Sequence, residues 1–222
     1  MSGQTQLVVM LTHHDLTVVD AAAVFEQCKD TKAQCWGFKE QPLPLDEMRR
    51  LYGRMKDCGK TTFMEVVAYG EAEGLEGAEM AVKCGCDVLM GTCYYDSIND
   101  LCRRHGLRYM PFVGRVEERP SVLYGTVEGM VEEAREYVRR GAYGVDLLGY
   151  RYVGDCERLI GELCGGLGAP VCVAGSIDSY ARLDVMRRVA PWAFTIGSAF
   201  FEGCFGGTMA EQIDRVCDYV AG

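Results

Sequence analysis

Short β-rich runs alternate with amphipathic helical stretches along all 222 residues of the chain. Eight runs have the pattern of buried strands: Leu7–Thr12, Ala33–Lys39, Thr61–Ala68, Val88–Thr92, Arg108–Arg115, Gly144–Arg151, Pro170–Ser176 and Ala193–Ser198. Eight stretches between and after them have apolar residues three and four apart with charges on the other face, roughly Val18–Cys28, Leu45–Cys58, Glu73–Cys84, Ser97–His105, Val127–Arg140, Cys156–Cys164, Ser179–Val189 and Met209–Val220. Each predicted helix can return the chain to a parallel strand, so this alternation strongly constrains the fold.

Eight strand–helix units in a chain of this length predict a fold of the α/β class, a parallel eight-stranded (β/α)8 TIM barrel. A doubly wound open sheet is the competing architecture, but it usually has fewer strands and a glycine-rich first turn. The segment from Gly3 to Leu16 contains no G-x-G-x-x-G pattern. No linker, low-complexity segment or charge block divides the chain, so we expect residues 1–222 to form a single barrel domain.

An internal repeat supports the barrel prediction. Residues 88–96 (VLMGTCYYD) align with residues 194–202 (FTIGSAFFE), and the same offset aligns residues 63–68 with residues 169–174. The third and fourth predicted strands therefore resemble the seventh and eighth, as a half-barrel repeat requires. The alternative is a chance similarity between two strand–helix units.

Composition narrows the classes of partner and compartment. The formal net charge of −9 argues against broad binding to nucleic acid or anionic membranes, which need basic surfaces. No signal-peptide pattern and no apolar stretch approaching 18 residues is present, so we expect a cytoplasmic protein without a membrane segment. The twelve cysteines include one C-x-C pair and no CxxC pair, and the three histidines complete no zinc pattern. We therefore expect reduced thiols, no metal site and no cofactor.

Two Gly-Ser pairs in the last quarter carry the strongest chemical signal. Gly175-Ser176 ends the seventh predicted strand, and Gly197-Ser198 ends the eighth and leads into a short helical turn. Glycine lets the backbone approach an anion, serine adds a hydroxyl donor, and N–H groups that open a helical turn point at the ligand. Loops after strands seven and eight of such barrels commonly hold phosphate, so the pairs predict a phosphate site. The alternative is that the glycines serve tight turns only.

The first half of the chain has a modified version of these pairs. Gly91-Thr92 aligns with the second pair, but Tyr69-Gly70 aligns with the first and is followed by Glu71 and Glu73. Carboxylates at this position would repel an anion, although they suit a helix N-terminus. We therefore expect one phosphate site, in the second half.

The segments AGSI (174–177) and TIGSAFFEG (195–203) resemble the ribulose-phosphate-binding barrel superfamily. This superfamily includes the phosphoribosyl isomerases of histidine and tryptophan synthesis and the N-acetylmannosamine-6-phosphate epimerases. The IGSAFFEG part is particularly similar to the strand-eight signature of the histidine-pathway isomerase. The resemblance implies a phosphate held by backbone N–H groups around Gly175, Ser176, Gly197 and Ser198.

Glu65 interrupts an otherwise apolar strand, residues 63–67 (FMEVV). An ionised carboxylate in such a strand is costly unless it is paired. On the neighbouring strand, Trp36 and Phe38 are expected to face the helices, which turns Lys39 inward as the natural partner. A Lys–Glu pair in a partly buried pocket is suited to general acid–base chemistry. The alternative is a structural salt bridge that plugs the barrel.

Three further charged residues are candidates for the site. Asp146 in the sixth strand is a candidate acid, base or orienting group, but its apolar neighbours leave its direction ambiguous. Arg151 and Arg115, at the predicted ends of strands six and five, are candidates for substrate binding. Arg115 precedes a long loop, Val116 to Gly125, which is a candidate lid, and a solvated surface arginine is the alternative there.

The loop after the first strand leaves the roles of His13 and His14 open. Adjacent histidines on a strand cannot both point at one site, and Asp15 resembles a helix or turn cap. The chain also departs from the families it resembles. Strand one (LVVMLT, residues 7–12) lacks the catalytic aspartate of the histidine-pathway isomerase, and Cys35 is not on the strand that carries the tryptophan-pathway cysteine. An epimerase-like pattern with Lys39 opposite a carboxylate is closer.

These features predict an isomerase or epimerase acting on a phosphorylated sugar or a similar small phosphate ester. Lys39 and a carboxylate, Glu65 or Asp146, would move a proton next to a carbonyl group. The alternatives are a Schiff-base aldolase or lyase on a sugar phosphate, with Lys39 as nucleophile, and a non-catalytic phosphate-ester-sensing barrel resembling the glycerol-phosphate-responsive antiterminators. The expected partners are the phosphorylated substrate and, because barrels often dimerise, a second copy of the chain in a homodimer.

Overall fold

The computed structural model describes residues 5–222 and contains the predicted parallel barrel. Its eight strands follow the spatial order β10-β11-β12-β1-β4-β5-β6-β7. They are β1 (Gln6–Met10), β4 (Cys35–Lys39), β5 (Thr61–Val66), β6 (Val88–Gly91), β7 (Arg108–Met110), β10 (Val145–Leu147), β11 (Val171–Val173) and β12 (Ala193–Ile196). A parallel bridge between Phe112 and Asp146 joins the β7 side to β10 and nearly closes the barrel.

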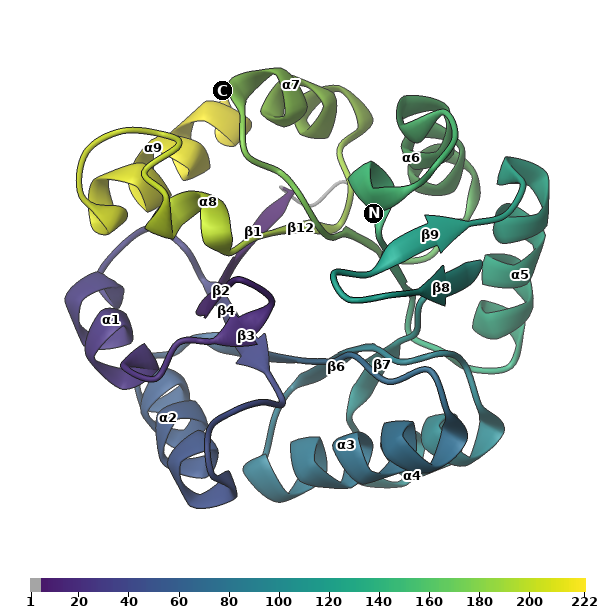
Figure 1. The fold of residues 1–222 in the computed structure, drawn as a ribbon, viewed down its shortest axis with the longest axis horizontal. Helices are drawn as coiled ribbons and strands as arrows, with labels where there is room; N and C mark the ends of the chain where they lie inside the picture. Colours follow the sequence, from purple (N-terminus) through teal and green to yellow (C-terminus); the bar gives the residue numbers. More distant parts are fainter. Residues whose placement is uncertain (1–4) are drawn as a thin grey trace.

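Helices surround the strands as an outer ring (Figure 1). They are α1 (Ala21–Cys28), α2 (Leu45–Asp57), α3 (Glu71–Cys84), α4 (Asp96–His105), α5 (Val127–Arg139), α6 (Cys156–Gly166), α7 (Tyr180–Val189), the short α8 (Ser198–Phe201) and α9 (Met209–Ala221). In α5 the buried residues Val127, Met130, Val131 and Ala134 form the apolar face that packs inward. None of the helices in residues 5–222 has the length and apolar content needed to cross a membrane.

Alternate strand residues face the helices and the barrel interior. Trp36 and Phe38 belong to the core between strands and helices, which turns Lys39 inward as predicted. Both strand neighbours of Asp146 belong to the same outer core, so Asp146 also faces the interior. The direction that the sequence left ambiguous is therefore fixed by packing.

The barrel interior is apolar at one level and charged at the next. Its apolar core consists of Val8, Met10, Cys35, Phe63, Val88, Met90, Met110, Cys172 and Ala193, and Trp192 packs against it. Gly37 of β4 is in register with Phe63 of β5 at this level. The next inward residues along the two strands are Lys39 and Glu65, which are also in register. The charged layer thus lies toward the carboxyl ends of the strands, where barrels of this kind bind their ligands.

The chain departs from the predicted strands after β7. This strand ends at Met110, just before Pro111, and Gly114 then turns the chain with a φ of +74°. Arg115 instead begins a hairpin of β8 (Arg115–Glu117) and β9 (Val122–Tyr124), within the segment predicted as a loop. The prediction that Arg115 ends strand five is therefore wrong.

Two smaller elements also differ from the predicted strands. Strand six is short, and the 3-10 helix η1 (Gly149–Arg151) follows it where the sequence predicted more strand. A second hairpin, β2 (Thr12–His13) with β3 (Leu16–Thr17), follows β1. Figure 1 shows this hairpin and the β8–β9 hairpin on opposite sides of the barrel opening. All twelve cysteines are free thiols.

Candidate active site

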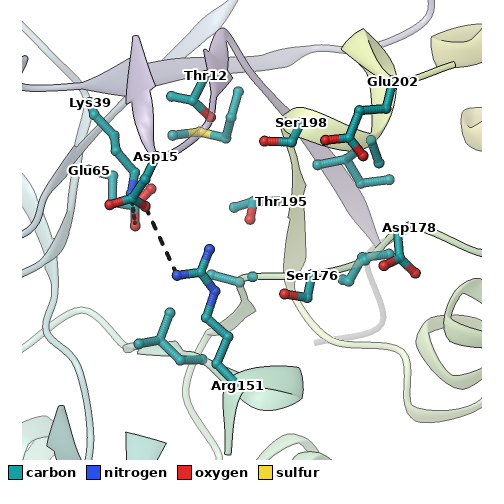
Figure 2. Close-up of a pocket in the computed structure, with 18 residues that line it drawn as sticks. Thr12, Asp15, Lys39, Glu65, Arg151, Ser176, Asp178, Thr195, Ser198 and Glu202 are labelled. Carbon is teal, nitrogen blue, oxygen red and sulfur yellow. Dashed lines mark hydrogen bonds and ion pairs between the residues drawn. The ribbon is translucent and has the colours of Figure 1, made fainter. Parts of the chain in front are cut away.

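A cavity of about 240 Å³ opens at the carboxyl ends of the strands (Figure 2). Gly175-Ser176, after β11, and Gly197-Ser198, after β12, line one side of it. Lys39 and Glu65, from β4 and β5, line the opposite side. Barrel closure therefore brings all four predicted phosphate-binding residues and two of the three predicted catalytic residues to one cavity.

The Gly-Ser turns present hydrogen-bond donors that the protein itself does not use. Within residues 5–222, the hydroxyls of Ser176 and Ser198 make no hydrogen bond, and the backbone N–H groups of Gly175, Ser176 and Ser198 donate none. In α8 the Phe200 N–H donates to the Gly197 carbonyl at 3.0 Å, so the preceding N–H groups have no intrahelical partner. Unused donors that line one cavity are suited to an anion.

Both glycines of these turns also have a packing requirement. Gly175 has a φ of +81°, and a Cβ there would lie 2.9 Å from Nε of Arg151. A Cβ on Gly197 would lie 2.5 Å from Oγ1 of Thr12. The turn interpretation and the phosphate interpretation of the sequence are therefore compatible, since the same glycines let Arg151 and Thr12 approach the cavity.

Lys39 is the centre of a charged cluster on the other side of the cavity. Its Nζ lies 2.5 Å from Oδ1 of Asp15 and 3.5 Å from Oε1 of Glu65 (Figure 2). The three side chains are only 8%, 13% and 12% exposed, respectively. The Thr17 hydroxyl donates to the Lys39 carbonyl at 2.8 Å and accepts from its N–H at 2.9 Å, which fixes the backbone. The predicted ion pair is present and includes a second carboxylate.

The cluster keeps Lys39 charged. Burial alone would lower the pKa of Lys39, but the charge of Glu65 and the hydrogen bond to Asp15 outweigh it, and the pKa is raised. Lys39 is therefore an ammonium group at neutral pH, able to stabilise negative charge in the cavity but poorly suited to act as a neutral amine.

Asp15 is the functional candidate that the sequence analysis missed. His14 and Asp15 form the two-residue loop of the β2–β3 hairpin, with φ values of +49° and +67°. Such loops favour glycine and asparagine, and other residues there store strain of about 1–3 kcal/mol each. The hairpin carries Asp15 to Lys39, whereas a capping role would leave it at the surface. A carboxylate in a tight turn directly after strand one was the available signal.

Asp146 lies inside the barrel and does not line the cavity. It is fully buried, and neither carboxyl oxygen has a hydrogen-bond partner within residues 5–222. Burial and the charge of Glu65 raise its pKa well above the ordinary value. The Gly91 N–H approaches the carboxyl without reaching ordinary hydrogen-bond geometry and opposes this increase only in part. The raised pKa thus favours the neutral, protonated form of Asp146.

The two predicted substrate-binding arginines lie in different places. Arg151 lines the cavity between the Gly-Ser turns and the Lys39 cluster, with Nη1 4.0 Å from Oδ1 of Asp15 (Figure 2). Arg115 lies on β8 with a side chain 61% exposed, paired with Glu117 and stacked over Tyr124. Arg115 does not contribute to this cavity, whereas Arg151 is positioned to contact a ligand in it.

Two acidic residues line the cavity beside the turns. Asp178 is paired with Arg182 at 2.8 Å, and Arg182 also donates to the carbonyl of Ser176. Glu202 Oε1 lies 3.6 Å from Nε2 of His13. The pairing of Asp178 reduces the negative charge that faces the turns, while the charge of Glu202 is offset only when His13 is protonated.

No family model matches the chain, and no curated protein matches it in sequence. Solved structures match it closely in fold. Orotidine 5′-phosphate decarboxylase from Pyrococcus horikoshii OT3 aligns with a TM-score of 0.71 at 15% identity, covering 98% of this chain and 100% of that one. N-acetylmannosamine-6-phosphate 2-epimerase from Clostridium perfringens aligns at 0.64 and 14%, covering 97% and 93%.

N-(5′-phosphoribosyl)anthranilate isomerase from Pyrococcus furiosus also aligns at 0.64 and 14%, covering 96% and 98%. The chain has the (β/α)8 barrel fold of these enzymes. In the barrel, β11 and β12 are the seventh and eighth strands, so the Gly-Ser turns follow the two strands whose loops commonly hold phosphate. At this identity the likeness concerns the fold, and the site depends on the residues described above.

Proposed function

We propose that this protein is an isomerase or epimerase that acts on a phosphorylated sugar or a similar small phosphate ester. One observation carries the proposal: a single cavity has unused donors at the Gly-Ser turns on one side and Lys39 with two carboxylates on the other. Its volume of about 240 Å³ is below the roughly 300–1,000 Å³ of pockets for drug-sized ligands, which favours a small substrate. The enzymes with this fold named above, which act on phosphorylated substrates, support the same class.

In the proposed reaction the turns bind the phosphate and hold the carbonyl group of the substrate near Lys39. Removal of a proton from the neighbouring carbon places negative charge on the carbonyl oxygen, and the Lys39 ammonium stabilises that charge. Glu65 is the better base, because its carboxylate makes no hydrogen bond within residues 5–222, while the Asp15 carboxylate accepts a hydrogen bond from Lys39 at 2.5 Å. Asp15 then positions the ammonium group, and Glu65 takes and returns the proton.

Asp146 has a supporting role in this proposal. Burial and the charge of Glu65 raise its pKa, which favours the protonated, neutral form of Asp146. A third ionised carboxylate would exceed the charge that Lys39 and Arg151 can offset. Since Asp146 does not line the cavity, we assign contact with the substrate to Glu65.

A Schiff-base aldolase or lyase is the second candidate, because Lys39 faces the cavity. Schiff-base formation needs a neutral amine, and the raised pKa of Lys39 opposes it. Borohydride trapping with a keto-sugar phosphate separates the two reactions. A covalent adduct at Lys39 would replace the isomerase proposal with the lyase.

Hydrogen exchange tests the proposed reaction most sharply. The protein is incubated in D₂O with a panel of aldose and ketose phosphates, and deuterium incorporation beside the carbonyl is followed by NMR. We expect incorporation with at least one ester in the wild type and its loss in Glu65→Gln. Lys60→Met is the matched control, since Lys60 is also buried but precedes β5 and donates to the carbonyl of Ala33. Binding of esters without any exchange or turnover in the wild type would favour the non-catalytic sensor.

A further inference from the structure

His13, His14 and Glu202 form a cluster at the rim of the cavity. His13 ends β2, His14 begins the hairpin loop, and Glu202 follows α8. One ligand atom of each residue lies within 4.8 Å of the other two. Adjacent histidines on a strand would not point at one site, but His14 lies beyond the strand, and its positive φ turns its ring back to stack on His13, with centroids 3.8 Å apart.

The Nε2 atom of His13 is an independent indication of a ligand. It is inaccessible to solvent and makes no hydrogen bond within residues 5–222. Its distance of 3.6 Å to Oε1 of Glu202 exceeds a hydrogen bond. The ring is held between His14 and Phe201, whose centroid lies 5.5 Å away, so the direction of the nitrogen is fixed. A buried nitrogen without a partner is unfavourable, and a cation between it and the carboxylate would satisfy both.

We propose that His13, His14 and Glu202 bind a divalent first-row transition-metal ion, with Zn²⁺ as the best match. Two imidazoles and one carboxylate form the ligand set of open zinc sites, in which water or substrate takes the fourth position. Imidazole ligands favour such ions over Mg²⁺ and Ca²⁺, which prefer oxygen. Zinc–ligand distances are about 2.0–2.2 Å, so the exposed side chains of His14 and Glu202 would have to rotate toward the ion.

An ion bound by this cluster would change the charge that faces the cavity. Glu202 lines the cavity together with Ser198. An ion held by Glu202 would offset that carboxylate and add positive charge beside the phosphate-binding turns. This consequence rests on the proposed function, whereas binding of the ion does not.

Titration with Co²⁺ after treatment with a chelator tests the site, because the visible absorption of Co²⁺ reports its ligands. We expect one equivalent to bind the wild type and the matched control His105→Ala, which alters the histidine that ends α4. His14→Ala and Glu202→Gln should each weaken binding at least about 100-fold, since losing a residue that merely supports a metal ligand already costs about 10–100-fold. Both changes are at exposed positions, so circular dichroism should show intact folding.

Three results would overturn the proposal. They are the absence of saturable Co²⁺ binding in the wild type, unchanged binding in both variants, and a sulfur-to-cobalt band that disappears in Cys204→Ser, the exposed cysteine. Inorganic phosphate distinguishes the two parts of the inference. Zn²⁺ that increases phosphate affinity in the wild type, but not in Glu202→Gln, supports the position beside the turns. If bound Zn²⁺ does not change the affinity for phosphate, the position of the ion beside the turns is refuted. The metal site itself is then judged by the Co²⁺ titration alone.

Discussion

The turns Gly175-Ser176, after β11, and Gly91-Thr92, at the end of β6, have nearly the same backbone and opposite surroundings. Their φ values are +81° and +59° in the first and +76° and +61° in the second. Ser176 lines the cavity with an unbonded hydroxyl, whereas Thr92 is fully buried and its hydroxyl is 2.7 Å from that of Tyr109. The same turn therefore lines an open cavity in one half of the barrel and is packed in the interior in the other, and neighbouring side chains decide which.

Tyr69-Gly70, which the repeat aligns with Gly175-Ser176, explains why we expect one phosphate site rather than two, because it lines a cavity rich in carboxylates. A second cavity, of about 480 Å³, lies over the end of β5 and is lined by Glu40, Glu73, Glu76 and Arg119. Arg119 is already paired with Glu40 and donates to the carbonyl of Val67. The excess of carboxylates in this cavity would repel an anion.

The largest expected effect concerns the cavity that only the second-half turn reaches. Lys39→Met removes the charge that stabilises the developing oxyanion, so the exchange rate should fall by about 10²–10⁴-fold. Inorganic phosphate should still bind, because the Gly-Ser turns are unchanged. Deuterium exchange and calorimetry measure the two quantities, with Lys60→Met as the control. If Lys39→Met exchanged hydrogen at the wild-type rate, Lys39 would have no part in the proposed reaction at this cavity.

Alanine at the two turn glycines should affect different properties. In Gly91→Ala the new Cβ would lie 2.4 Å from the carbonyl oxygen of Val66, so urea unfolding should show a loss of about 2–5 kcal/mol. In Gly175→Ala the nearest atoms belong to the flexible Arg151, so we expect a loss of about 1 kcal/mol and roughly tenfold weaker phosphate binding.

Gly168→Ala controls for backbone strain alone, because Gly168 has a φ of +70° and open space around it. It should lose about 1 kcal/mol without any change in phosphate affinity. Equal losses of stability in Gly91→Ala and Gly175→Ala would show that the surroundings do not distinguish the two turns.

Asp146, whose carboxyl is approached by the Gly91 N–H, gives a prediction about how stability depends on pH. Its pKa is raised in the folded state, so the unfolded state releases its proton first as the pH rises from about 4. Stability contributed by the protonated form is complete below that pH and is lost as the pH rises toward the folded pKa. Asp146→Asn does not titrate, so its free energy of unfolding relative to that of the wild type should increase between pH 4 and pH 7. Urea unfolding at pH 4 and 7 measures this, and a constant difference would refute it.

The smallest expected effects come from the two hydroxyls. Ser176→Ala should weaken phosphate binding about 2–10-fold and leave the free energy of unfolding within about 0.5 kcal/mol. Thr92→Val should do the reverse, losing about 1 kcal/mol of stability with the bond to Tyr109 while phosphate affinity is unchanged. Calorimetry and urea unfolding on both variants check the pair. If both variants changed stability and phosphate affinity in the same way, the two turns would be equivalent.

Regular periodicity made much of this structure predictable from the sequence. Period-2 alternation placed Trp36 and Phe38 outward and Lys39 inward, and the register of β4 with β5 then brought Lys39 to Glu65. The Gly-Ser pairs were found because their chemistry is local and their strands close the barrel. The repeat aligned Gly91 with Gly197, but Gly197 has a φ of −122°, so the alignment matched the strands and not the loop conformations.

The missed features all depend on irregular backbone that periodicity does not describe. Asp15 and His14 reach their partners only because consecutive residues with positive φ fold the loop back over the barrel. Arg115 was misplaced because Pro111 and Gly114 end the strand early and start a hairpin. The backbone conformation of single turn residues determines where these side chains lie. The same short sequence can adopt several turn conformations, so these positions could not be predicted from it.

The central claim is that the donors of Gly175, Ser176 and Ser198 bind phosphate and that their first-half counterparts do not. Backbone amide resonances of the ¹⁵N-labelled protein, followed during titration with inorganic phosphate, test it directly. We predict saturable shifts that are largest at Gly175, Ser176 and Ser198 and negligible at Gly91 and Thr92. Saturable shifts centred on Gly91 and Thr92, or no saturable shift at the Gly-Ser turns, would contradict the account.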